Sequence, residues 1–177
     1  LAKEIIKDIK EGADGTTIKS GMIGEVGCTW PLTDQERKVI RASARAQRET
    51  GASISIHPGR DEKAPLEIIE LLHSAGGDIT RTVMGHLDRT VFDRNLLNDL
   101  AQTGCYLEWD LFGIEESYYH LNSKIDMPGD AKRMDDIGWV LSQGYGNKIL
   151  VSHDISLKSR LEKYGGHGYS YITDNVA

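Results

Sequence analysis

The stretch Ser53-Ile54-Ser55-Ile56-His57 alternates small polar and branched apolar residues and ends on a histidine. Four further short runs of apolar character lie at 22–27, 82–86, 105–109 and 148–152. Short runs rich in branched or aromatic side chains are typical of the buried strands of a parallel sheet. We therefore predict five β-strands at these positions.

Helix signals fill the intervals between the predicted strands. Thr33 and Glu36 form a capping-box pattern at the start of one helix. Pro65 suits the first turn of a second helix, and Asp93 and Asp130 open two more. Each of these helices is closed by a glycine before the next strand, because the residue after a helix often needs a positive φ. These glycines are Gly51, Gly76, Gly104 and Gly144.

Residues 1–11 add one further helix before the first strand, so helices and strands alternate along the whole chain. Strict alternation with short connections indicates an α/β fold with a parallel sheet and crossover helices. Two architectures satisfy this order: an open, doubly wound sheet, or part of a (β/α)8 barrel. We expect a single domain over residues 1–177, because a chain of this length suits one hydrophobic core.

Composition limits the classes of partner. The chain has 21 Lys and Arg against 27 Asp and Glu, a formal net charge of −6. This acidic balance argues against a nucleic acid or an anionic membrane and leaves a small molecule as the expected partner. No apolar run approaches the roughly 20 residues that span a bilayer. The two cysteines, Cys28 and Cys105, are too few for a disulfide scaffold and favour a reducing, cytoplasmic compartment.

Metal-ligand side chains stand at the carboxyl ends of four predicted strands, where parallel α/β folds build their functional sites. They are Glu25, His57, His86 and Asp154. Taken singly, each would be read as a solvated or hydrogen-bonded structural residue. One such side chain from each of several βα units favours a shared site, and imidazoles with carboxylates suit Zn²⁺ or a similar divalent ion. His153 should point away if Asp154 points into that site, because side chains alternate along a strand.

Other motifs provide weaker starting points for a function. The glycine-rich stretch 165–169 follows no strand directly and lacks the Lys-Ser/Thr of a phosphate-binding loop. The sequence contains no G-x-S-x-G motif, so a serine hydrolase is not indicated. A non-catalytic α/β scaffold that keeps the fold without the chemistry stays open as the alternative to an enzyme.

Five motifs in order resemble the phosphotriesterase branch of the amidohydrolase superfamily, and within it the phosphotriesterase-related proteins of animals. They are Gly24-Glu25-Val26-Gly27-Cys28, His57-Pro58-Gly59, Gly85-His86-Leu87-Asp88-Arg89-Thr90, Ser152-His153-Asp154 and Tyr164-Gly165-Gly166-His167-Gly168-Tyr169. The resemblance covers essentially all 177 residues. It implies the C-terminal five βα units, strands 4 to 8, of a (β/α)8 TIM barrel. The first three strands and the last helix of such a barrel would be missing, in keeping with a start at Leu1.

The resemblance also implies two divalent metal ions, usually zinc, bridged by a hydroxide. Glu25 would take the place of the bridging carboxylate, and His57 and His86 would hold one metal. Asp154 would bind the other metal and act as the catalytic group that accepts a proton and passes it on. The family's remaining two ligands are an HxH pair, and this sequence contains no HxH.

The subgroup resemblance points to hydrolysis of the amide bond of small N-acyl amino acids such as N-acetyltaurine, with hydrolysis of phosphotriesters or lactones as an alternative. An anionic group on such a substrate calls for a cation close to the site. Arg60, Arg89 and Lys158 follow the relevant strands and are the candidate substrate-binding residues. The long segment 111–129 leaves a strand at its carboxyl end, so it is expected to act as a lid over the substrate.

Overall fold

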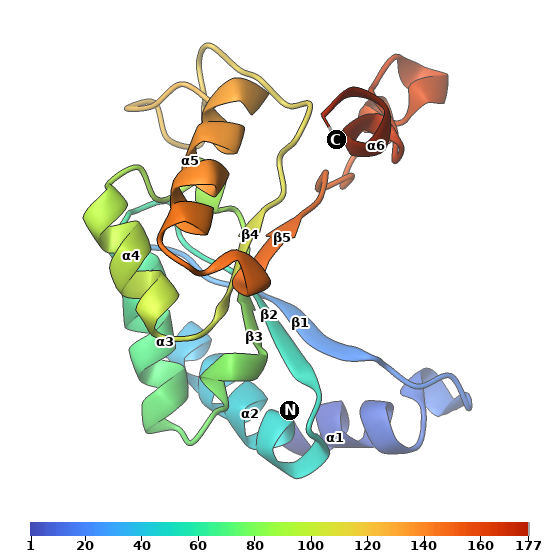
Figure 1. Cartoon of the computed structure of the whole chain (residues 1–177). Helices are drawn as coiled ribbons and strands as arrows, with labels where there is room; N and C mark the ends of the chain where they lie inside the picture. The colour runs from blue at the N-terminus through green and yellow to red at the C-terminus, as the bar shows by residue number, and fades with distance from the viewer. Residues whose placement is uncertain (177) are drawn as a thin grey trace.

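The computed structural model describes residues 1–176, and its centre is one five-stranded parallel sheet (Figure 1). The strands lie in the order in which they follow each other in the sequence, as the strict alternation predicts. Their bounds are β1 Met22–Gly27, β2 Ser53–His57, β3 Thr82–Met84, β4 Tyr106–Trp109 and β5 Ile149–Val151. All four neighbouring pairs are parallel, so all five carboxyl ends lie at the same edge of the sheet.

Helices connect the strands, and Figure 1 shows α3, α4 and α5 together along one side of the sheet. The helices are α1 Ala2–Lys10, α2 Asp34–Thr50, α3 Ala64–Ser74, α4 Arg94–Gln102, α5 Asp130–Ser142 and α6 Tyr171–Asn175. The predicted capping box is present at the start of α2, where Thr33 and Glu36 satisfy each other's backbone N–H groups. The Asp93 side chain caps α4 by accepting from the backbone of Asn95. None of the helices in residues 1–176 is long and apolar enough to cross a membrane.

The strands divide their side chains between a core face and a more open face. In β2 the side chains of Ile54 and Ile56 are fully buried, whereas Ser53, Ser55 and His57 are half-buried. Because side chains alternate along a strand, the apolar residues pack towards the helices and the histidine lies on the opposite face. The apolar pattern that builds the core therefore also fixes the side of the sheet on which His57 lies.

An irregularity in β1 sets the position of Glu25. The register against β2 shifts between Ile23 and Val26, both of which are buried in the core. Between them Gly24 has a φ of 111°, and a Cβ there would lie 2.5 Å from the carbonyl oxygen of Ser55. Only glycine tolerates both the positive φ and this close approach. The irregularity leaves Glu25 facing out of the core.

The third strand ends earlier than the sequence predicts. The run 82–86 predicts a strand through His86, but β3 stops at Met84 and His86 has a φ of 54° in the left-handed region. Gly85 still donates to the carbonyl of Ile56 at 3.0 Å, after which the chain turns into the short 3-10 helix Leu87–Arg89. The left-handed conformation of His86 turns the chain out of the sheet, whereas an extended conformation would have continued the strand.

The segment 111–129 builds a small core of its own. Leu111, Tyr119 and Met127 are buried against each other, with Ile114 and Ile125 packed around them. The backbone N–H of Met127 donates to the carbonyl of Glu116 at 2.8 Å. The segment is thus an ordered loop with apolar contacts, and it lies directly beyond β4.

Candidate metal centre

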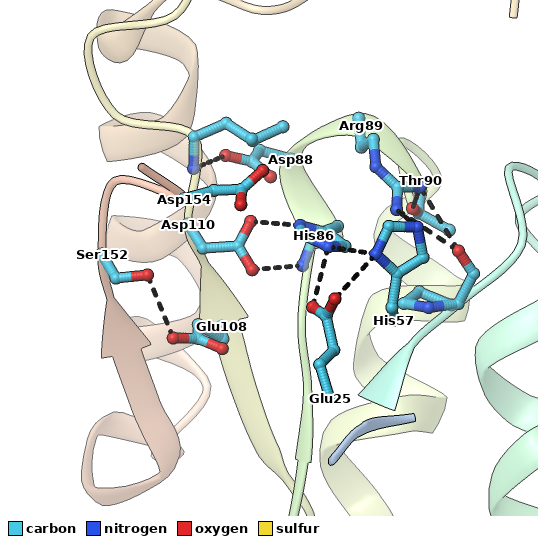
Figure 2. Close-up of polar contacts among 12 residues, drawn as sticks. Glu25, His57, His86, Asp88, Arg89, Thr90, Glu108, Asp110, Ser152 and Asp154 are labelled. Carbon is cyan, nitrogen blue, oxygen red and sulfur yellow. Dashed lines mark hydrogen bonds and ion pairs between the residues drawn. The ribbon is translucent and has the colours of Figure 1, made fainter. Parts of the chain in front are cut away.

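Three of the four predicted ligands meet at the carboxyl edge of the sheet (Figure 2). Glu25 comes from β1, His57 ends β2 and His86 follows β3. One donor atom from each lies within 4.8 Å of the others. The Glu25 carboxylate is 3.1 Å from His57 Nδ1 and 3.0 Å from His86 Nε2, and these two nitrogens are 2.8 Å apart. Two imidazole nitrogens and a carboxylate so close together fit the donor set of a zinc ion.

Asp110 fixes the orientation of the His86 ring. Its Oδ2 accepts from the backbone N–H of His86 at 2.8 Å, and its Oδ1 lies 2.7 Å from His86 Nδ1. Both side chains are buried. Because Nδ1 is held by Asp110, Nε2 points towards Glu25 and His57. A carboxylate that holds the second nitrogen of a histidine ligand is a common feature of metal sites.

The proton affinities of these groups indicate a site suited to a cation. Hydrogen bonds with His57 and then with His86 hold the pKa of Glu25 well below its ordinary value. Burial opposes protonation of His86, but hydrogen bonds with Asp110 and Glu25 outweigh it and raise its pKa to about 9. A protonated His86 thus lies between two carboxylates. A divalent cation can replace that proton, since metal binding competes with protons for the same lone pairs.

Asp154 lines a cavity together with Glu25, His57 and His86 but is not part of their cluster. Its carboxylate is 3.2 Å from Arg160 Nη1, which also donates to the Asp154 carbonyl. Like His86, Asp154 has a positive φ, 41°, at the end of a strand, and such conformations often accompany functional sites. Its neighbour His153 points elsewhere, because its Nε2 accepts from the backbone N–H of Ile172 in α6.

A cavity of about 360 Å³ opens over the cluster. Arg60 and Arg89, two of the three predicted substrate-binding residues, line it. Lys158 is not among the described residues that line it, and its ammonium lies over the ring of Tyr164, 5.6 Å from the centroid. The segment 111–129 supplies most of the apolar lining, through Leu111, Ile114, Tyr119, Leu121 and Met127.

A network of buried ion pairs connects α5 with this edge of the sheet. Arg133 of α5 is fully buried and contacts Asp88 Oδ2 at 3.0 Å, Asp130 Oδ1 at 2.6 Å and the carbonyl of Ile114 at 2.7 Å. Asp88 Oδ2 also accepts from the backbone N–H of Leu111 at 2.9 Å. Burial and the charge of Asp110 raise the pKa of Asp88 to about 6. The network ties α5 to the turn that follows His86.

Sequence reasoning did not assign three of the residues that shape the site: Asp110, Tyr119 and Arg160. Asp110 directly follows the predicted strand 105–109, so its position at the carboxyl end of a strand could have identified it as a site residue. The contacts of Tyr119 and Arg160 depend on loops whose course the sequence pattern does not reveal.

Comparison with known proteins now places this geometry in a family. The sequence profile of the Phosphotriesterase family matches residues 1–177. The chain belongs to the phosphotriesterase family. It is 56% identical over 176 residues to the phosphotriesterase-related protein of Nematostella vectensis and 54% identical to the N-acetyltaurine hydrolase of Mus musculus. In both cases the alignment covers 99% of this chain and 50% of the relative, so the chain spans about half the length of the curated relatives it matches.

Solved structures of similar proteins share the fold. A resiniferatoxin-binding protein from Rhodobacter sphaeroides superimposes with a TM-score of 0.92 at 34% identity, covering 98% of this chain and 48% of that one. The phosphotriesterase homology protein from Escherichia coli, complexed with phosphate in its active site, gives a TM-score of 0.83 at 31% identity, covering 99% and 57%. The chain therefore forms five consecutive βα units of a (β/α)8 barrel, as the sequence resemblance implies. Enzymes of this family are metal-dependent, and the Glu25, His57 and His86 cluster is the candidate site in this chain.

Proposed function

We propose that this chain carries a metal site and the catalytic group of a hydrolase that cleaves the amide bond of small N-acyl amino acids such as N-acetyltaurine. The observation that carries the proposal is the convergence of Glu25, His57 and His86 within 4.8 Å under a cavity at the carboxyl edge of the sheet. Support for the substrate comes from relatives such as the N-acetyltaurine hydrolase of Mus musculus, at 54% identity.

In this proposal His57, His86 and Glu25 would hold one divalent metal ion, such as zinc. Glu25 and Asp154 would be ligands of a second ion, whose remaining ligands would come from the part of the intact protein that these 177 residues do not span. A divalent ion at such a site lowers the pKa of water towards neutrality and polarises the carbonyl oxygen of an amide.

The other steps belong to the residues of this chain. Asp154, which lines the cavity, takes up the proton released by the attacking water on its carboxylate and passes it to the departing amine. Arg60 and Arg89 hold the acidic group of the substrate, and Leu111, Tyr119 and Met127 shape the space for the acyl group and keep water away. The acidic chain and the free thiols of Cys28 and Cys105 support a small-molecule enzyme of the cytoplasm without nucleic-acid or membrane partners.

An amidase assay on the intact protein tests this function. The protein is stripped of metal with a chelator, reloaded with zinc and assayed with N-acetyltaurine, a lactone and a phosphotriester. We expect zinc-dependent release of taurine that is lost in Glu25→Gln and kept in Arg41→Met, since Arg41 is exposed on α2. Faster turnover of the lactone or phosphotriester would favour the alternative substrates. Zinc binding without turnover of any of the three would favour a non-catalytic scaffold.

A further inference from the structure

Two guanidinium groups at the cavity have only neutral hydrogen-bond acceptors in the described part of the chain. Arg60 Nε donates to the hydroxyl of Tyr119 at 2.6 Å. Arg89 donates to the carbonyl of Pro58, to the hydroxyl of Thr90 at 3.0 Å, and to His57 Nε2 at 3.1 Å. Among the described residues no carboxylate forms an ion pair with either guanidinium, although Glu25, Glu116 and Asp154 also line the cavity.

The positive charge of Arg89 is the more costly of the two, because its side chain is buried. Burying a cation without a counter-charge is costly. Arg160 also lines the cavity, but its charge is compensated by Asp154. The two guanidinium groups of the cavity without an ion pair to a described residue are therefore those of Arg60 and Arg89, and Arg89 contacts His57 of the metal cluster.

The contact between Arg89 and His57 depends on which ring nitrogen carries the proton. Arg89 Nη2 can donate to His57 Nε2 only while Nε2 has a free lone pair. The opposite nitrogen, Nδ1, faces Glu25 and His86 and is the one directed into the metal cluster. A neutral imidazole has one N–H, so a metal that takes the Nδ1 lone pair leaves the proton on Nε2. Arg89 Nη2 and His57 Nε2 then both carry hydrogens, so Arg89 can no longer donate to His57.

We propose that a divalent metal at Glu25, His57 and His86 frees the Arg89 guanidinium from His57, and that Arg89 and Arg60 then bind the carboxylate or sulfonate of the substrate. This inference rests on the proposed function and adds that metal and substrate anion bind cooperatively. The cation also adds positive charge beside both arginines, which an anion offsets. An empty metal site therefore binds the substrate poorly, because Arg89 is still held by His57.

Tyr119 gives Arg60 its direction in this arrangement. Its hydroxyl accepts from Nε, and its ring is buried in the small core of the segment 111–129. The two terminal nitrogens of Arg60 are left for a paired contact with a planar or tetrahedral oxyanion. The segment 111–129 thus acts on substrate selection through Tyr119, in addition to lining the cavity.

Zinc titration in the presence of simple anions tests the coupling. Zinc affinity of the chain is measured by calorimetry with methanesulfonate or acetate replacing chloride at constant ionic strength. Coupling between two sites is reciprocal and amounts to about 5–150-fold in typical cases. We expect zinc affinity to rise within that range as either anion is added. The anion that gives the larger increase identifies the preferred acidic group.

Matched variants identify the residues responsible. Arg89→Met should still bind zinc but lose the anion effect, Arg60→Met should weaken it, and Arg41→Met on the exposed face of α2 should keep it. A readout that needs no variant is the ¹⁵N NMR spectrum of the unaltered chain. Zinc should move the His57 proton to Nε2 and shift the Arg89 side-chain signals.

Three outcomes would overturn the proposal: zinc affinity independent of both anions, an anion effect that survives in Arg89→Met, or Arg89 signals that zinc leaves unchanged. If any of these is found while the intact protein still hydrolyses N-acetyltaurine with zinc, only the coupling is wrong. A chain that binds no zinc at all would overturn the coupling, whereas the proposed function is overturned only if the zinc-loaded intact protein turns over none of the three substrates.

Discussion

Asp110 holds His86 at two points, the backbone N–H at 2.8 Å and the ring Nδ1 at 2.7 Å. The two residues come from neighbouring strand ends, so the pairing links the edges of β3 and β4. With the backbone and the ring both fixed, the ring cannot rotate without breaking a buried hydrogen bond. The direction of Nε2 towards Glu25 is therefore set before any metal arrives.

Asp110→Asn should weaken zinc binding by about 10–100-fold, the usual cost of losing a hydrogen-bonding partner of a histidine ligand. The two contacts use the two separate oxygens of Asp110, and an asparagine has an NH2 donor in place of one of them, so it cannot make both contacts with His86. Zinc affinity is measured by competition with a chelating dye. Asp99→Asn, at an exposed position of α4, serves as the control. Equal zinc affinity in both variants would show that Asp110 does not orient the ligand.

Asp154→Asn should lower kcat of the intact protein by about 10²–10⁴, the range for general acid–base catalysis, even with zinc content restored. The amide keeps the size of the side chain but removes its basic oxygen. His153→Asn should instead act on stability, because His153 anchors α6 through the backbone of Ile172. Both variants are assayed at measured zinc content. A larger loss of kcat in His153→Asn would mean that the wrong residue has been assigned to proton transfer.

The Arg133 and Asp88 pair should behave as one unit in unfolding experiments. Arg133→Met alone should destabilise the chain by about 3–5 kcal/mol, because it leaves Asp88 buried without its cation. The double variant Asp88→Leu, Arg133→Met should lose much less than the two single changes together. Urea unfolding followed by circular dichroism gives the four free energies. Additive losses would contradict a direct interaction.

The capping box of α2 gives a prediction with a defined pH dependence. Burial raises the pKa of Glu36, but hydrogen bonds from Thr33 and Thr29 together outweigh this and lower it below its ordinary value of 4.5. The ionised carboxylate therefore stabilises the fold above pH 4.5, and this contribution is lost as the pH falls through the lowered value. Thr33→Ala should cost about 1 kcal/mol at neutral pH.

Glu36→Gln isolates the pH effect. The difference in unfolding free energy between this variant and the unaltered chain should be largest near neutral pH and shrink below pH 4.5. Glu70→Gln, at an exposed position of α3, should show no such trend. A difference that stays constant from neutral to acid pH would mean that the charge of Glu36 does not take part in the cap.

Local patterns in the sequence were enough to predict the fold. The alternation in Ser53–His57 and the capping residues Thr33 and Asp93 act through near neighbours in the chain, so the pattern alone indicates the strand and the helix starts. The same reasoning placed Glu25, His57 and His86 at one edge, because parallel strands share their carboxyl ends.

Long-range contacts account for what the sequence could not predict. Arg133 contacts Asp88 from 45 residues away, and the Arg60 contact with Tyr119 spans 59 residues. The position of Lys158 over Tyr164 depends on the course of the chain after β5, which has no periodic pattern. The irregularity at Gly24 is a change in the register of β1 against β2, so it depends on the pairing of two strands and not on a local sequence pattern.

Anomalous X-ray diffraction from zinc-soaked crystals of the chain tests the central claim most directly. The account predicts a zinc peak within about 2.0–2.2 Å of His57 Nδ1, His86 Nε2 and a carboxylate oxygen of Glu25. Data collected on both sides of the zinc absorption edge identify the element. A strong zinc peak elsewhere on the chain, with none between these three side chains, would contradict the account.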